Sequence, residues 1–253
     1  VNAGKENEAN YGVFLGYQAG LCNTTGESNV FLGLSAGRLT TTGGCHVVLG
    51  QEAMNDGIVT GTNNIVIGCK AASDVTSASN LISIGRNAGH ANVEGGHSII
   101  IGASAGITGT DICGNIIIGW EAGYAGSFTG LNNTMVGNQT GCDITSGGYN
   151  TLLGHCAGTN LTSGDDNVMV GRGAGQNGAV TGDQNTFVGS YAGKSLTSGA
   201  RNVAIGRCSA CNLSTGSDNI LAGWFAGKCL GSGSNNVLLG YRASTNVTGS
   251  SNV

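Results

Sequence analysis

An apolar triplet followed by glycine recurs along the whole chain at a nearly constant spacing. Fourteen such glycines follow one another at intervals of 17 residues, or of 18 residues in three cases. Self-similarity at a fixed period is typical of architectures in which each repeat stacks on its neighbours. The spacing therefore predicts a single continuous array of short coils over residues 1–253. The triplet glycines are Gly16, Gly33, Gly50, Gly68, Gly85, Gly102, Gly119, Gly137, Gly154, Gly171, Gly189, Gly206, Gly223 and Gly240.

The triplets themselves predict strands. They are short and rich in β-branched residues, as in Ile65–Ile67 and Ile99–Ile101. Glycine bounds each triplet on one side, and Asn usually bounds it on the other, which is typical of a short strand between turns. A helix needs about ten residues without glycine, and no repeat provides them. We therefore expect an all-β fold: a β-solenoid (parallel β-helix or β-roll) of about fifteen coils of 17–18 residues.

The three 18-residue repeats place their extra residue at the same point. It comes just before Ile58-Val59-Thr60-Gly61 and before the equivalent segments that begin at Ser127 and Ala179. Insertions confined to one point of a repeat map to a loop on one side of the stack. We expect this point to be one corner of the coil.

The residue before the triplet is Asn in ten of the fourteen repeats. Stacked Asn side chains form ladders of amide hydrogen bonds along a stack of strands. Asn also tolerates the left-handed backbone conformation of turns. The sequence leaves these two interpretations open.

Both faces of the triplet are apolar. Successive strand residues point to opposite faces, and a strand that is apolar on both faces is typically buried on both. One face lines the interior of the coil, whereas the other has no partner within a one-layer solenoid. An apolar stripe of this length is rarely left exposed on a soluble monomer. We therefore expect self-association, with a parallel homotrimer as the most natural arrangement and any close-packed bundle as the alternative.

The composition fits a packed β structure rather than a flexible linker. Glycine supplies 48 residues and proline none, charged residues make up 9%, and hydrophobic residues 40%. A chain this apolar can bury enough surface to offset its ordering entropy. The ten Lys and Arg residues are scattered along the sequence without a basic stripe, and no apolar run reaches the length of a membrane helix. We expect neither nucleic-acid binding nor membrane insertion.

The two ends both fall inside the repeat. Val1-Asn2-Ala3-Gly4 matches residues that follow a triplet glycine, and Asn252-Val253 matches the start of a triplet. Solenoids need polar caps, and neither end resembles one. We therefore expect the chain to be an uncapped window of a longer fibre protein.

The repeat resembles that of known fibre proteins. Residues 185–193 (NTFVGSYAG) and 29–37 (NVFLGLSAG) resemble repeats of phage and bacterial tail-fibre-like proteins. Residues 201–206 (RNVAIG) are similar, more distantly, to the head repeat of trimeric autotransporter adhesins, a left-handed β-roll wound as a trimer. The resemblance implies a structural role outside the cell, at a cell surface or on a virion.

Catalytic, cofactor and metal sites are not expected. The four His residues occupy different offsets in the repeat, and Cys208 and Cys211 have a Cys-x-x-Cys spacing that no second pair completes. Several of the nine Cys residues are expected to be buried small apolar residues. Cys211 and Cys229 lie at neighbouring offsets on adjacent coils, so we expect them to form a disulfide if their Cβ atoms point together.

Large side chains vary most at the position after the triplet glycine. Variable residues on a rigid scaffold are where binding surfaces arise, so this position is the candidate surface-binding site. The same aromatic rings would alternatively cover the apolar edge of a neighbouring coil. The candidate residues are Tyr17, Trp120, Trp224 and Tyr241.

Three functions compete. The leading hypothesis is the structural shaft of an extracellular or virion fibre. The second is an adhesin or receptor-binding segment that recognises host-surface glycans. The third and weakest is ice binding, because a Thr column recurs but is interrupted by apolar residues and glycine. That column comprises Thr24, Thr41, Thr76, Thr145, Thr162, Thr197 and Thr248.

Overall fold

A computed structural model describes residues 2–124, 128–244 and 249–253 of the chain. The chain divides into two compact units, residues 1–129 and 130–253. Both are built from three-residue parallel strands joined by turns, and the all-β solenoid expected from the repeat is confirmed. No helix in the described part of the chain is long and apolar enough to cross a bilayer.

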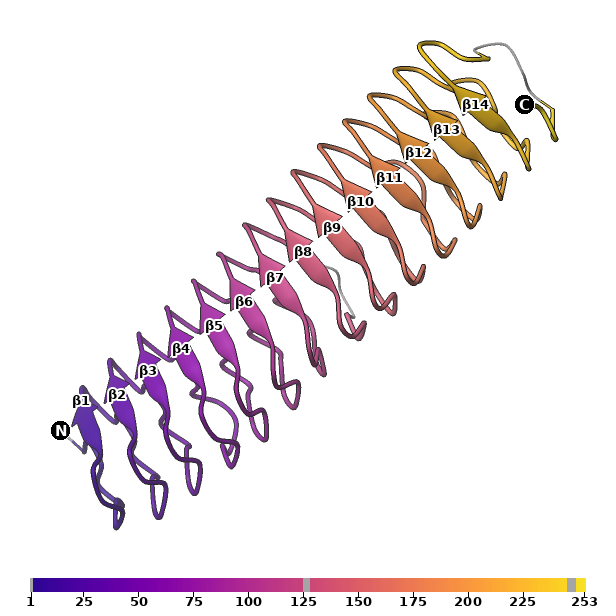
Figure 1. Ribbon diagram of the computed structural model, residues 1–253. Helices are drawn as coiled ribbons and strands as arrows, with labels where there is room; N and C mark the ends of the chain where they lie inside the picture. The colour runs from indigo at the N-terminus through magenta and orange to yellow at the C-terminus, as the bar shows by residue number, and fades with distance from the viewer. Residues whose placement is uncertain (1, 125–127, 245–248) are drawn as a thin grey trace. The chain divides into compact units, whose positions relative to one another are not determined.

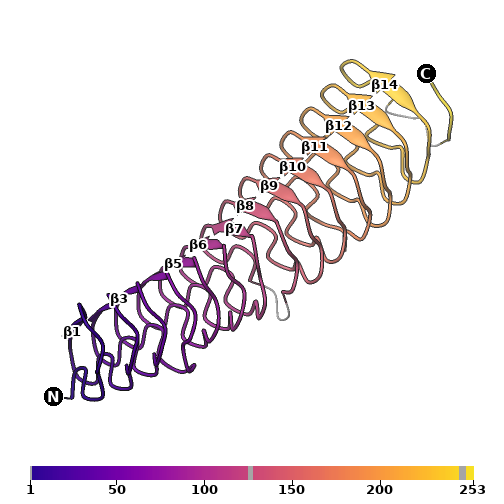
Figure 2. The same cartoon turned by 60° about the horizontal axis from the view of Figure 1, so that its bottom comes forward.

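The first unit contains seven strands that pair in parallel and in register. Each strand is one apolar triplet, so Val13 pairs with Val30 and Phe14 with Phe31 across consecutive coils. Figure 1 shows these strands side by side, and Figure 2 shows the turns that return the chain to the next strand. The strands are β1 (Val13–Leu15), β2 (Val30–Leu32), β3 (Val47–Leu49), β4 (Ile65–Ile67), β5 (Ile82–Ile84), β6 (Ile99–Ile101) and β7 (Ile116–Ile118).

The second unit repeats this pattern with seven further strands. Register is again fixed by the repeat, so that Met169 lies between Leu152 and Phe187. The turns bond coil to coil as well, as where the Gly193 N–H donates to the Ser209 carbonyl at 2.9 Å. The strands are β8 (Thr134–Val136), β9 (Thr151–Leu153), β10 (Val168–Val170), β11 (Thr186–Val188), β12 (Val203–Ile205), β13 (Ile220–Ala222) and β14 (Val237–Leu239).

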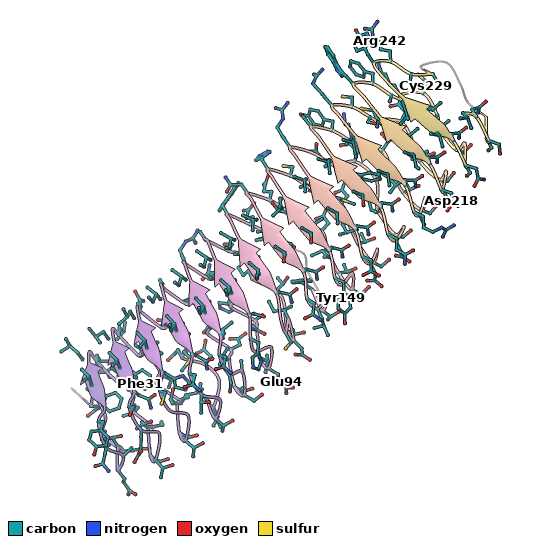
Figure 3. The ribbon with its side chains drawn as sticks, in the orientation of Figure 1. Phe31, Glu94, Tyr149, Asp218, Cys229 and Arg242 are labelled. Atoms are coloured by element: carbon teal, nitrogen blue, oxygen red, sulfur yellow. The ribbon has the colours of Figure 1, made fainter. Side chains whose placement is uncertain are left out.

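The middle residue of each triplet points into the coil. Phe31, labelled in Figure 3, and Phe187 are completely buried, each in its own unit. The small residue three positions after the triplet glycine faces them from the opposite wall, as Ala36 and Ala192 do, and is equally buried. The coil is therefore thin, because a large side chain on one wall leaves room only for Ala, Ser or Thr on the other.

The Asn residues form a buried ladder. In the second unit Asn202 donates through Nδ2 to Oδ1 of Asn185 at 3.0 Å and to the Gly216 carbonyl at 2.9 Å. The Oδ1 atom of Asn202 accepts from the backbone N–H of Asn219 at 3.1 Å and from Nδ2 of Asn219 at 2.8 Å. Each side chain thus joins three coils. The ladder interpretation is confirmed.

The left-handed conformation belongs to the residue before the ladder. Tyr149 has φ 57° and Arg201 has φ 56°, whereas the ladder residues Asn150 and Asn202 do not have positive φ. The residues before the ladder positions form a left-handed column along the stack. Tyr and Arg in this column hold a backbone conformation that is strained for side chains of their kind. The turn interpretation is therefore wrong for the ladder Asn, because the left-handed residue is the one that precedes it.

Two of the 18-residue coils accommodate their extra residue next to an isolated bridge between coils. Val59 and Val180 are buried and bridge to Thr40 and Leu161 of the preceding coils, which keeps the column aligned. The residue before each of them points outward, and Ile58 is 63% exposed. The third insertion falls at residues 125–127, outside the described residues.

The triplet glycines are required by backbone conformation and, where another coil stacks on them, by space as well. Gly206 has φ 123°, which side-chain-bearing residues rarely adopt. A Cβ atom on Gly206 would lie 2.6 Å from the Gly223 carbonyl oxygen of the next coil. The backbone of one coil rests directly on the next at this point, and this contact explains why the glycine recurs without exception.

Candidate interaction surfaces

The first and third residues of the triplets point outward and form what we call the outer strand face in each unit. Several are among the most exposed apolar side chains: Leu15 is 67% exposed, Ile205 and Ile220 46%, and Leu239 66%. The face consists only of Val, Ile, Leu, Thr and Ala, with no charged residue in any strand. Among the described residues of the chain, every side chain of this second face keeps some exposure to solvent, and its burial by a neighbouring chain remains a prediction.

The four candidate aromatic residues share one column at the C-terminal ends of the strands. Tyr17 is 52% and Trp120 48% exposed, but they are separated by several coils of the first unit. In the second unit Trp224 and Tyr241 lie on adjacent coils with ring centroids 5.5 Å apart. The rings of Trp224 and Phe225 stack at the same centroid distance. Trp224 thus covers part of the neighbouring coils and still presents about half of its surface to solvent.

Five basic residues gather at this same corner of the second unit. They occupy the first, second or fifth position after a triplet glycine in the coils of β10–β14, and four of the five are exposed. Their positions in the sequence predicted no basic stripe, because consecutive members are 13 to 22 positions apart. Folding at a 17-residue period brings them together. The residues are Arg172, Lys194, Arg207, Lys228 and Arg242.

The basic residues pack on aromatic rings. Tyr191 lies between the Arg172 guanidinium, 4.8 Å from its centroid, and the Lys194 ammonium, 5.3 Å away. Phe225 is flanked in the same way by Arg207 at 5.8 Å and Lys228 at 5.0 Å. The ring quadrupole attracts each cation and fixes its position without neutralising its charge. We call these five cations with Tyr191, Trp224, Phe225 and Tyr241 the basic–aromatic edge.

Three thiols, those of Cys208, Cys211 and Cys229, lie at this corner of the second unit. Cys211 occupies the column of Lys194 and Lys228 and is buried, and its Sγ donates to the Tyr191 carbonyl at 3.3 Å. Burial, with a hydrogen bond to the Cys208 thiol, raises the pKa of Cys211 to about 12. Cys229 is exposed, and both it and Cys211 are free thiols. The Cys211–Cys229 disulfide remains a prediction, and the thiol that contacts Cys211 here is Cys208.

His46 replaces Asn in the ladder of the first unit. It is completely buried, and its Nδ1 accepts from the backbone N–H of Asn64 at 3.2 Å. Its Nε2 is buried without a well-formed hydrogen bond. Burial lowers the pKa of His46 to about 4, although the nearby Gly61 backbone opposes this shift. The imidazole is therefore neutral at pH 7.

The Thr column expected to matter for ice binding is used inside the fold. Thr24 Oγ1 donates to the Thr41 carbonyl at 3.1 Å, and Thr145 and Thr197 bond the next coil in the same way. These side chains are only partly exposed, so their hydroxyls connect coils instead of forming a free array. Thr248 lies outside the described residues.

Comparison with known proteins finds no matching family model and no matching curated protein. The described residues hold no group of three His, Cys, Asp or Glu side chains placed to bind a metal ion. The outer strand face and the basic–aromatic edge are therefore the surfaces from which a function must be argued.

Proposed function

We propose that this chain is a structural shaft segment of a fibre outside the cell or on a virion, and that its coils self-associate through the outer strand face. The observation that carries the proposal is that, in each unit, every strand turns an uncharged and mostly apolar face outward, where its side chains are partly or largely exposed. Large exposed apolar patches on soluble proteins typically mark interaction sites.

The size of the face supports association. Seven strands about 4.8 Å apart, each three residues long, present on the order of 300 Å² per unit. Two units therefore offer about 600 Å² per chain, close to the roughly 800 Å² that each partner contributes to a typical stable interface. A homotrimer would use this face around a common axis, as the sequence resemblance implies.

The occupant that fits is a second copy of the chain. A partner must bring apolar side chains at the same coil spacing over many coils, because any other period would fall out of register after a few strands. The outer strand face has that period itself. In unit 1 all of its residues are Val, Ile or Leu, which interdigitate well on a flat surface.

Light scattering and sedimentation of the full chain test this proposal. We expect an oligomer at micromolar concentration, and dissociation when Ile205→Lys and Ile220→Lys place charges on the face. Thr215→Lys is the matched control, because Thr215 is exposed in the same coil but lies away from the strand. Far-UV circular dichroism checks that each variant folds. A wild-type monomer, or equal dissociation by the control, would overturn the proposal.

A further inference from the structure

The same corner of the coil carries acidic side chains in the first unit. There Lys70 lies 3.4 Å from Glu52, and the His90 ring 3.7 Å from Asp74 on adjacent coils. Acidic side chains thus lie next to basic groups at this corner, which is the ordinary arrangement of a solvated surface.

The basic–aromatic edge of the second unit has no such acids. Between residues 171 and 244 the only acidic residues are Asp183 and Asp218, and both precede a strand, at the opposite corner. Asp218 is paired there with Arg201 at 2.7 Å. Figure 3 shows Asp218 and Arg242 at opposite ends of the strands. Five cations therefore share one edge without a counter-charge.

We propose that the basic–aromatic edge is a binding site for an acidic polysaccharide. Its cations recur on successive coils, which rise by about 4.8 Å each. This row suits a linear polymer with regularly spaced carboxylate or sulfate groups better than a single small anion. The cations are already held by the rings of Tyr191 and Phe225, so little side-chain entropy is lost on binding.

The aromatic geometry favours sugars over nucleic acid bases. Stacking of successive bases requires a series of open ring faces. Tyr191 has Arg172 of the preceding coil and Lys194 of its own coil over its ring. Phe225 likewise has Arg207 and Lys228 over its ring. Trp224 and Tyr241, at one end of the edge, have one cation each, Arg207 at 5.8 Å and Arg242 at 5.3 Å from the ring centroid, and are the most exposed rings of the edge. A pyranose ring can lie against each of these with its apolar face.

Polar side chains at the edge complete the match to a hydroxylated ligand. Asn177 and Asn212 are exposed in the coils of Arg172 and Arg207, beside the cations. Each amide offers both donors and acceptors, which is what sugar hydroxyls require. The cations select for negative charge, and the amides and exposed rings select for the sugar.

Binding of size-defined oligosaccharides to the full chain tests the proposal. The probes are a sulfated heparin oligosaccharide, a carboxylated oligogalacturonate, neutral dextran and single-stranded DNA of equal charge. We expect binding of at least one acidic oligosaccharide that weakens as salt rises, and none of dextran. The two acidic probes distinguish sulfate from carboxylate as the preferred group. Tighter binding of DNA than of both acidic oligosaccharides, or no binding of either, would overturn the proposal.

Two sets of variants locate the site. Arg207→Gln with Lys228→Gln should weaken binding at least tenfold and reduce its salt dependence. Trp224→Leu should weaken it several-fold while leaving the salt dependence unchanged. Arg201→Gln is the matched control, since Arg201 is exposed on an adjacent coil but lies at the opposite corner with Asp218. Equal loss in the control would overturn the location, and circular dichroism confirms that all variants fold.

Discussion

His46 accepts a hydrogen bond through Nδ1 from the backbone N–H of Asn64, in the position where the other ladder residues present an amide oxygen. Asn29 makes the equivalent bond to the backbone N–H of His46 at 2.9 Å. The imidazole thus continues the row of hydrogen bonds in which each ladder side chain accepts from the backbone N–H of the next ladder residue. It accomplishes this only in its neutral form, because a protonated ring has no acceptor.

This relationship predicts that acid destabilises the first unit. His46 has a pKa of about 4 in the folded chain, whereas in the unfolded chain it titrates near 6.5. Between these values the unfolded state binds a proton that the folded state does not, so stability is lost as pH falls from 6.5 to 4. The loss from this one group amounts to about 3 kcal/mol. Denaturant unfolding at pH 7 and pH 4 measures it.

His46→Asn is the variant that isolates the effect. The amide restores an acceptor that does not titrate, so the difference in unfolding free energy between pH 7 and pH 4 should shrink by about 3 kcal/mol. His97→Asn is the control, because His97 is exposed. If both variants reduced the pH dependence equally, His46 would not be its source.

The Asn ladder predicts a large cost for removing one member. Asn202→Ala removes the acceptor of the Asn219 backbone N–H and the donor to the Gly216 carbonyl, both buried. We expect a loss of about 2–4 kcal/mol in unfolding free energy, because buried polar groups lose their partners. Asn212→Ala, an exposed Asn ten residues away, should change stability by less than about 0.5 kcal/mol. Similar losses in both would contradict the ladder.

Part of this ladder was accessible from the sequence and part was not. A column of Asn at a 17-residue period indicates either a ladder or a turn. The two differ in the φ angle of the Asn, which the sequence does not reveal. The left-handed residue lies one position earlier, where Tyr149, Arg201 and His97 give no sign of a turn. Strand register and the position of the extra residues, by contrast, follow directly from the spacing of glycines.

The left-handed column predicts an unusual response to β-branched residues. Tyr149, labelled in Figure 3, has φ 57° and is 64% exposed, so its side chain contributes little packing. Tyr149→Val should lower the unfolding free energy by about 1 kcal/mol, and Tyr149→Gly should raise it by a similar amount. Thermal or denaturant unfolding measures both. Stabilisation by Val would show that the turn adopts another conformation.

Thiol reactivity should separate the two cysteines of the expected disulfide. Because burial and the Cys208 thiol raise the pKa of Cys211 to about 12, it remains protonated and unreactive at pH 8. Cys229 is exposed and should be alkylated rapidly by iodoacetamide. Mass spectrometry of the native chain, treated without reductant, reports each site. Protection of both residues, reversed together by reductant, would instead establish the Cys211–Cys229 bond.

The basic–aromatic edge could not be read from the sequence for a geometric reason. Arg207, Lys228 and Arg242 occupy different offsets in the repeat, and each is far from the next along the chain. The offsets one, two and five fall on one corner only because the chain turns sharply after the triplet glycine. The sequence located Trp224 and Tyr241 correctly in one column, but not the cations that surround them.

Two triplet glycines allow the cost of backbone strain to be measured separately from the cost of a clash between coils. Gly206 and Gly240 share a similar backbone conformation, with φ 123° and 117°. A Cβ on Gly206 would lie 2.6 Å from the Gly223 carbonyl oxygen, whereas a Cβ on Gly240 would meet nothing within 4 Å. Gly240→Ala should therefore cost only the conformational strain, about 1–3 kcal/mol. Gly206→Ala should cost more than about 4 kcal/mol, because it also forces two coils apart. Equal losses in denaturant unfolding would mean that the coils are not stacked this closely, and that the repeat retains glycine for its φ angle alone.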